Sequence, residues 1–153
     1  MADNKIKSKY VYEERSALDH YTADAFVVRC FDNRFWKVIK HFIKDRNMKH
    51  IDTESPAGGA KVFSSPEAAG DLDYMFRELD KSVKLHHTKT VMLFSHHDCG
   101  AYGGFLRFDN NSDKELDFHR FEHHRGAQSI RERFPNLKVE TYFVDDEGII
   151  KTN

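Results

Sequence analysis

The chain has 153 residues, of which 39% are hydrophobic and 32% are charged, and its formal net charge is −1. This length and composition are typical of one soluble globular domain that buries roughly two-thirds of its unfolded surface. The charge balance gives no indication of nucleic acid or an anionic membrane as a partner, and the apolar runs are far too short to span a bilayer. The polar N-terminus contains no signal-peptide core, so we expect the protein in the cytoplasm.

The first third of the chain predicts an arm, a strand, a helix and a second strand. Residues 1–23 are polar with scattered tyrosines, and we expect an N-terminal arm that contains at most a short helix. Residues 26–30 are a compact run that contains β-branched residues and ends in a cysteine, which predicts a strand. Apolar side chains recur at three- and four-residue spacing over 34–47, which predicts an amphipathic helix. A second strand is expected near 49–52.

The next segment predicts a turn and then a helix. Glycine, proline and serine gather in residues 55–60, as in a turn-forming loop. Ser65 and Pro66 have the residue types preferred at the N-cap and at the first helical position, so we expect a helix to begin there. The apolar stripe of that helix runs over 68–83.

The rest of the chain continues the alternation of strands and helices. Residues 90–94 are almost entirely apolar, which predicts a central parallel strand buried on both faces. A helix is expected over 113–133, a strand over 139–144, and a short return strand at 149–150. This order predicts an α/β fold, with a central and mostly parallel sheet flanked by helices, in a single domain that spans residues 1–153.

The two cysteines and one histidine form the most informative pattern. Cys30 ends the first predicted strand, and His96 and Cys99 follow the central one. Because sites in parallel sheets form beyond the carboxyl ends of adjacent strands, we expect the three side chains to converge. Two thiolates and an imidazole suit Zn²⁺, and three protein ligands leave the fourth position open, as in a catalytic site. A disulfide is the alternative, which the expected reducing compartment disfavours.

An acidic and a basic residue lie directly after the first cysteine. Asp32 and Arg34 are close enough in sequence to form a charge-assisted pair. Held by Arg34, the carboxylate of Asp32 could orient a water molecule beside the metal, and released it could become a fourth ligand. The plainer interpretation is an acidic residue at a helix N-terminus, favoured by the helix dipole.

The combined pattern Cys-x-Asp-x-Arg and His-x-Asp-Cys-Gly resembles the β-class carbonic anhydrases, and the resemblance spans about residues 26–104. The loop at Ala57 also resembles a turn of that family. The resemblance implies that Cys30, His96 and Cys99 bind zinc, that Asp32 and Arg34 form the catalytic dyad, and that Gly58 and Gly59 belong to a substrate-binding loop. The matching residues are Cys30, Asp32, Arg34, His96, Asp98, Cys99, Gly100, Ala57, Gly58 and Gly59.

The implied activity is that of a zinc lyase, which hydrates carbon dioxide reversibly to bicarbonate and a proton. The family forms homodimers or larger homo-oligomers whose N-terminal arm embraces the partner subunit, and the partner chain completes the substrate pocket. Asn33, Ser55 and Pro56 depart from the family pattern, and the chain is short for the family. Two alternatives therefore stay open. One is a hydrolase of carbonyl sulfide or carbon disulfide on the same scaffold, and the other is a catalytically silent zinc-binding homologue.

Other histidines are expected to lie outside the site. His119 and His123 have the helical i, i+4 spacing that can bind a metal, but no further ligand accompanies them. We therefore expect these two residues and His124 on a solvated or interface face of a helix. We expect His97, beside the predicted ligand His96, to point away from the site and to be structural.

Overall fold

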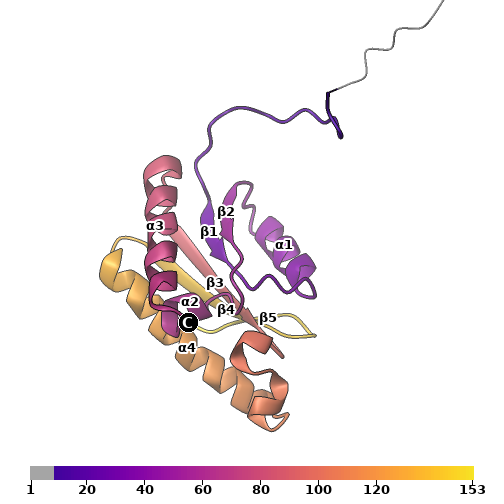
Figure 1. Cartoon of the computed structure of the whole chain (residues 1–153), viewed down its shortest axis with the longest axis vertical. Helices are drawn as coiled ribbons and strands as arrows, with labels where there is room; N and C mark the ends of the chain where they lie inside the picture. Colours follow the sequence, from indigo (N-terminus) through magenta and orange to yellow (C-terminus); the bar gives the residue numbers. More distant parts are fainter. Residues whose placement is uncertain (1–8) are drawn as a thin grey trace, which may run out of the picture.

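The computed structural model describes residues 9–153, and its centre is a five-stranded sheet with the strand order β2-β1-β3-β4-β5 (Figure 1). Strands β1 to β4 are parallel, and β5 pairs with β4 in the antiparallel direction. The strands are β1 (Ala25–Val28), β2 (Ile51–Glu54), β3 (Thr90–His96), β4 (Lys138–Val144) and β5 (Ile149–Lys151).

Helices cover both faces of this sheet, as the sequence predicts. Figure 1 shows α1 on one side and α3 and α4 on the other. The helices are α1 (Trp36–Asp45), α2 (Lys61–Ser64), α3 (Ala69–His86) and α4 (Ser112–Arg133), with 3₁₀ turns at Gly100–Tyr102 and Phe105–Phe108. The prediction of an α/β fold with a central, mostly parallel sheet is confirmed.

The alternation of side chains along β3 divides the core into two layers. Met92 and Phe94 face α1 and pack in one apolar cluster with Ile39. Val91 and Leu93 face α3 and α4 and belong to the other cluster. Because both faces of β3 are covered, nearly every side chain of this strand is buried, which explains the unbroken apolar run from Val91 to Phe94.

The sequence predicts that a helix begins at Ser65 and Pro66, and this start is wrong for α3. The helix α3 has its N-cap at Ala68, and Ser65 instead follows the short helix α2. The hydroxyl of Ser65 donates a hydrogen bond to Glu122 Oε1 at 2.9 Å and so links the loop to α4. Serine is a preferred N-cap residue, but Ser65 makes a tertiary contact instead, and local sequence preference does not predict such a contact.

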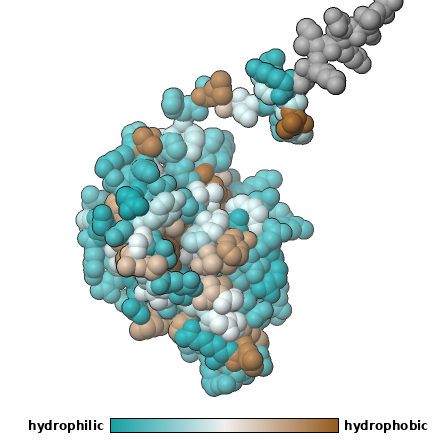
Figure 2. Space-filling model, viewed as in Figure 1, coloured by the Kyte–Doolittle hydropathy of each residue, from teal (hydrophilic) through white to brown (hydrophobic). Residues whose placement is uncertain are grey.

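The N-terminal segment runs away from the body of the protein (Figure 1), and no helix or strand occurs in residues 9–23. The remainder of the predicted arm, residues 1–8, lies outside the described residues. Val11, Tyr12 and Leu18 expose most of their side chains, and Figure 2 shows apolar patches on this segment. Within residues 9–153 we find no helix with the length and apolar character needed to cross a membrane.

Candidate metal centre

The structure brings together the three side chains that the sequence predicts as metal ligands. One ligand atom from each of Cys30, His96 and Cys99 lies within 4.8 Å of the other two, and all three residues are buried. Cys30 follows β1, His96 ends β3, and β1 and β3 are adjacent parallel strands. Neighbouring strand ends therefore place the ligands at one edge of the sheet, the edge where α/β folds form their sites.

The imidazole of His96 has the arrangement of a metal ligand. Its Nδ1 lies 2.8 Å from the carbonyl oxygen of His97, so Nδ1 carries a hydrogen and donates a hydrogen bond to that oxygen. Nε2 is then left with a lone pair, and it is buried without a hydrogen-bond partner among residues 9–153. A buried, unpaired nitrogen beside two sulfurs fits a metal ion that prefers nitrogen and sulfur, as zinc does.

The two thiols form no disulfide and lie close together. The hydrogen bond from the Cys99 thiol is the main cause that lowers the pKa of Cys30, and the amide of Gly58 adds to it from 3.4 Å. The same pairing and burial raise the pKa of Cys99. One proton is therefore held between the two sulfurs, and a cation in its place would be bound by two thiolates.

A carboxylate is held at the border of this cluster. Arg34 Nε donates to both Asp32 oxygens at 3.1 Å, and its Nη2 donates to Asp32 Oδ2 at 2.8 Å. These bonds hold the pKa of Asp32 at about 2, so the side chain is ionised at neutral pH. Asp32 Oδ2 lies 3.8 Å from His96 Nε2. The pair is therefore formed, and its carboxylate borders the ligand cluster.

Arg34 has a second acidic partner. Its Nη1 lies 3.3 Å from Asp98 Oδ2, and its Nη2 donates to the Asp98 carbonyl oxygen at 3.2 Å. Asp98 belongs to the motif that the sequence shares with a known family, but sequence reasoning assigned it no role. The guanidinium connects the turn after β1 to the turn after β3.

The two glycines of the predicted substrate loop lie against Cys30 and the end of β3. Gly58 and Gly59 have positive φ angles of 83° and 56°. A Cβ atom on Gly59 would lie 2.2 Å from the Phe94 carbonyl oxygen and 2.7 Å from the Cys30 nitrogen. Only glycine allows the loop to cross so close to the ends of β1 and β3. A role for this loop in substrate binding stays a prediction.

The space beside the ligands is small and mainly apolar. A cavity of about 10 Å³ is bordered by Cys30, Asp32 and His96 together with Phe35, Ile39, Phe94 and Ser95. Phe35 stacks on His96, with 4.7 Å between the ring centroids. A cavity of this size has room for about one water molecule.

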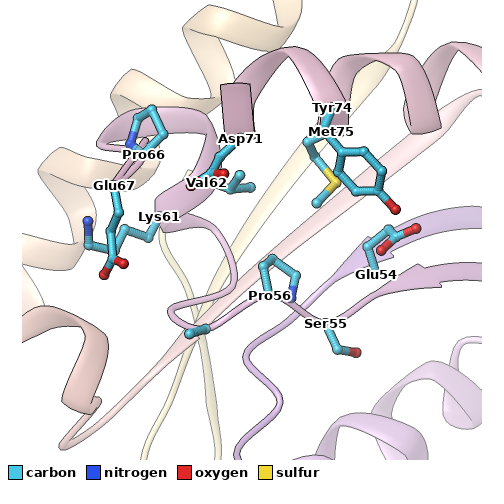
Figure 3. Close-up of a pocket in the computed structure, with 11 residues that line it drawn as sticks. Glu54, Ser55, Pro56, Lys61, Val62, Pro66, Glu67, Asp71, Tyr74 and Met75 are labelled. Atoms are coloured by element: carbon cyan, nitrogen blue, oxygen red, sulfur yellow. The ribbon is translucent and has the colours of Figure 1, made fainter. Parts of the chain in front are cut away.

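A larger cavity, of about 420 Å³, lies beside the same loop but contains none of the ligands (Figure 3). It is bordered by residues of the loop after β2, by α2 and by the first half of α3. Its charged side chains are Glu54, Lys61, Glu67 and Asp71, and Tyr74 and Met75 line its wall.

The expectation of a solvated or interface histidine face on α4 is wrong for two of the three histidines, because these two are buried inside the chain. His119 and His123 are fully buried, whereas His124 is exposed. Both buried rings meet the hydroxyl of Ser95, at 2.7 Å from His119 Nδ1 and 2.6 Å from His123 Nε2. Within residues 9–153, the only cluster suited to a metal is that of the two cysteines and His96.

His97 points away from the ligands, as predicted, and its partner is a residue that sequence reasoning missed. Its Nδ1 lies 2.6 Å from Glu115 Oε2. Glu115 is 1% exposed although it lies in the first turn of α4, a position that usually faces solvent. No signal in the sequence distinguishes it from the other acidic residues of that turn.

Comparison with protein families and curated proteins identifies relatives. Residues 21–152 match the model of a family described as "Putative carbonic anhydrase". An uncharacterized protein of Rickettsia conorii is 30% identical over 136 residues, which cover 84% of this chain and 71% of that protein. Another, from Rickettsia bellii, is 32% identical over 69 residues, which cover 44% of this chain and only 42% of that protein.

Solved structures share the fold at low sequence identity. A β-carbonic anhydrase of Trichomonas vaginalis has a TM-score of 0.61 and 14% identity, with 91% of this chain and 87% of that chain covered. A tetrameric β-carbonic anhydrase of Sordaria macrospora has a TM-score of 0.59 and 14% identity, with 86% and 81% covered. A carbon disulfide hydrolase has a TM-score of 0.50 and 12% identity, with 87% and 81% covered.

Proposed function

Because this chain belongs to the carbonic anhydrase family whose model it matches, and has the β-carbonic anhydrase fold, we propose that it is a zinc lyase that hydrates carbon dioxide reversibly to bicarbonate and a proton. The observation that carries the proposal is the buried cluster of Cys30, His96 and Cys99 beside an ionised Asp32. A structural zinc site with four protein ligands would have no use for such a carboxylate at its border.

In this proposal Cys30 Sγ, His96 Nε2 and Cys99 Sγ hold the metal. A zinc ion bound there would supply a Lewis acid that lowers the pKa of water, so that water can attack carbon dioxide at neutral pH. The carbonyl oxygen of His97 contributes by accepting a hydrogen bond from His96 Nδ1, which keeps Nε2 directed at the sulfurs. Three protein ligands leave a coordination position for water or substrate.

Asp32 and Arg34 are the residues that we propose to act on the reacting water. Asp32 is ionised at neutral pH and so can only accept hydrogen bonds. Asp32 Oδ2 lies 3.8 Å from His96 Nε2. From there it can accept a hydrogen bond from the reacting water, which orients the oxygen lone pair that attacks the substrate. Arg34 holds the carboxylate in this place, and its release would let Asp32 move towards the ligands.

The substrate would enter next to the apolar side of the site. Phe35, Ile39 and Phe94 border the cavity at the ligands, which suits a small uncharged molecule such as carbon dioxide. The cavity itself is too small for it, so access requires a small displacement of these side chains or of the loop with Gly58 and Gly59, which we propose as part of the substrate site.

We also propose a homodimer or larger homo-oligomer in the cytoplasm. The exposed apolar side chains of Val11, Tyr12 and Leu18 on the extended arm support a contact with another copy of the chain. The similar protein of Sordaria macrospora is tetrameric.

Stopped-flow measurement of carbon dioxide hydration, with the zinc content determined on the same sample, tests the proposal. We expect about one zinc per chain and measurable turnover. Asp32→Ala should keep the zinc and lower turnover by about 10- to 100-fold, because Asp32 acts beside the metal and not as a ligand. Asp117→Ala changes an exposed aspartate on α4 and is the matched control. Loss of zinc from Asp32→Ala would contradict the proposed role of Asp32.

Hydrolysis of carbon disulfide or carbonyl sulfide is the second candidate. The solved carbon disulfide hydrolase shares the fold, and the apolar border of the cavity also suits these linear molecules. The same sample should therefore be assayed with both compounds. Turnover of either one without turnover of carbon dioxide would replace the first proposal, and a full complement of zinc without any turnover would identify a catalytically silent homologue.

A further inference from the structure

A buried glutamate lies directly behind the proposed metal ligands. Glu115, in the first turn of α4, is 1% exposed. Its Oε2 lies 2.6 Å from His97 Nδ1, and its Oε1 accepts the backbone N–H of Asp98 at 2.8 Å. Both carboxylate oxygens are therefore paired, and both partners belong to the turn between two ligands.

That turn determines where two of the proposed ligands lie. His97 and Asp98 are the two residues between His96 and Cys99. The carbonyl oxygen of His97 accepts a hydrogen bond from His96 Nδ1, and this bond directs Nε2 at the sulfurs. Any rotation of the peptide between His97 and Asp98 would turn the imidazole of His96 and move Cys99.

The turn also has a backbone conformation that needs support. Asp98 has a φ angle of +54°, in the left-handed region that non-glycine residues rarely adopt. Such a conformation persists where the surrounding bonds hold it. Glu115 binds the N–H of Asp98 on one side, and the Asp98 side chain accepts the N–H of Phe105 at 2.9 Å on the other.

The same turn presents Asp98 to the catalytic pair. Asp98 Oδ2 lies 3.3 Å from Arg34 Nη1, and Arg34 in turn holds Asp32. Glu115 is thus linked to the proposed ligands His96 and Cys99 through the turn at His97 and Asp98. Through Asp98 and Arg34 it is also linked to Asp32. Its position at the N-terminal end of α4 adds a favourable interaction with the helix dipole.

We propose that Glu115 is the positioning residue of the metal centre, which sets metal affinity by fixing the His97–Asp98 peptide. The inference rests on the proposed metal site and goes beyond it, because it assigns this role to a residue of α4 that is not one of the three proposed ligands. Residues that hold metal ligands in this way typically contribute 10- to 100-fold to metal affinity.

Two substitutions separate the parts of this role. Glu115→Gln keeps the shape of the side chain and one oxygen for the Asp98 amide, but it removes the charge. We expect it to weaken Zn²⁺ and Co²⁺ binding by about tenfold. Glu115→Ala removes both contacts, and we expect a loss of about 100-fold.

Glu122→Gln is the matched control. Glu122 is also a buried glutamate of α4, and it accepts a hydrogen bond from Ser65, on the loop between α2 and α3. Its substitution makes the same chemical change on the same helix without touching the ligand turn. We expect it to lower the midpoint of thermal unfolding while metal affinity stays within twofold of the original chain.

The test uses the full chain, freed of metal and titrated with Co²⁺, whose absorption bands report thiolate binding, and with Zn²⁺ in competition with a chelator. Unchanged affinity in Glu115→Gln, alongside a loss of thermal stability like that of Glu122→Gln, would overturn the inference and leave Glu115 as a structural residue. Glu115→Gln decides the question if Glu115→Ala does not fold. If the original chain binds neither ion, the proposed function fails. That outcome differs from failure of the inference on Glu115, because it is seen in the unsubstituted protein.

Discussion

Ser95 and His96 are neighbours on β3, and their side chains lie in two regions that use histidine in opposite ways. His96 stacks on Phe35 on the face of the sheet covered by α1, and its Nε2 is directed at two sulfurs. Ser95 points to the face covered by α4, where its hydroxyl meets His119 and His123. All three imidazoles are buried, so the difference between the regions arises from their partners.

The partners shift the pKa of the rings in opposite directions in the two regions. Burial lowers the pKa of His96, but the Cys30 thiolate, the His97 carbonyl and the charge of Asp32 outweigh it, so the pKa is raised overall. Burial alone dominates at the other region and lowers the pKa of both His119 and His123 to about 3. The anions beside His96 favour a positive charge at that place, whether a proton or a metal ion, whereas His119 and His123, among hydroxyls and aromatic rings, stay neutral.

The neutral region is a connected hydrogen-bond network. Ser95 has one hydroxyl proton, so it donates to one of the two rings and accepts from the other. His123 Nδ1 continues to Thr152 Oγ1 at 2.7 Å, and Thr152 continues to Thr141 Oγ1 at 2.6 Å. The network joins α4 to β3, to β4 and to the C-terminal segment. We expect it to contribute to stability and not to metal binding.

The largest expected effect is a loss of zinc that occurs when the first region is changed but not when the second is. Cys99→Ser removes one of three ligands, and because zinc sites bind with about 10–16 kcal/mol, the loss of one ligand should weaken affinity by about 1,000-fold. His123→Gln alters a ring of the neutral network and should leave zinc bound. Metal analysis after dialysis against a chelator measures both. Equal zinc loss in the two variants would show that the regions are not separate.

A smaller effect is expected when the neutral region is broken at its centre. Ser95→Ala leaves a nitrogen unpaired on both His119 and His123, and each buried unpaired group destabilises by about 1–3 kcal/mol. The free energy of unfolding should therefore fall by about 2–6 kcal/mol, as measured by urea denaturation, while zinc stays bound. Ser112→Ala, at the exposed start of α4, should change it by less than about 0.5 kcal/mol. A Ser95→Ala protein as stable as the original would contradict the network.

The sequence predicted the first region well because its information is local. An apolar run predicts β3. Once β1 and β3 are adjacent and parallel, the residues at their carboxyl ends must lie at the same edge of the sheet. Cys30, His96 and Cys99 therefore converge in any arrangement that pairs the two strands. The contact between Asp32 and Arg34 is also local, because only one residue separates them.

The second region could not be predicted, because the buried face of α4 is largely polar. Residues buried on this helix include Glu115, His119, Glu122 and His123, at helical spacing with Ala127 and Ile130. A search for an apolar stripe misses such a face. Each of these polar groups is buried only because a distant residue pairs with it, such as Ser95 or Ser65, and those pairings exist only in the folded chain.

The smallest expected effect is a difference in the pH dependence of stability. The unfolded chain binds protons on both histidines near pH 6.5, whereas in the folded protein the pKa of His119 and of His123 is about 3. The unfolded state therefore binds more protons between these values, and stability falls as the pH decreases from 7. The two residues together should lower the free energy of unfolding by about 1–2 kcal/mol between pH 7 and pH 6.

Urea denaturation of the original chain and of His123→Gln at both pH values isolates this contribution, because the other titrating groups are common to the two proteins. The variant has lost one of the two neutral histidines, so its decrease in stability should be smaller by about 0.7 kcal/mol. A nuclear magnetic resonance titration of His119 and His123 should find both rings neutral at pH 5. An identical pH dependence in the two proteins would mean that His123 takes up its proton while folded, and the contrast with His96 would then be wrong.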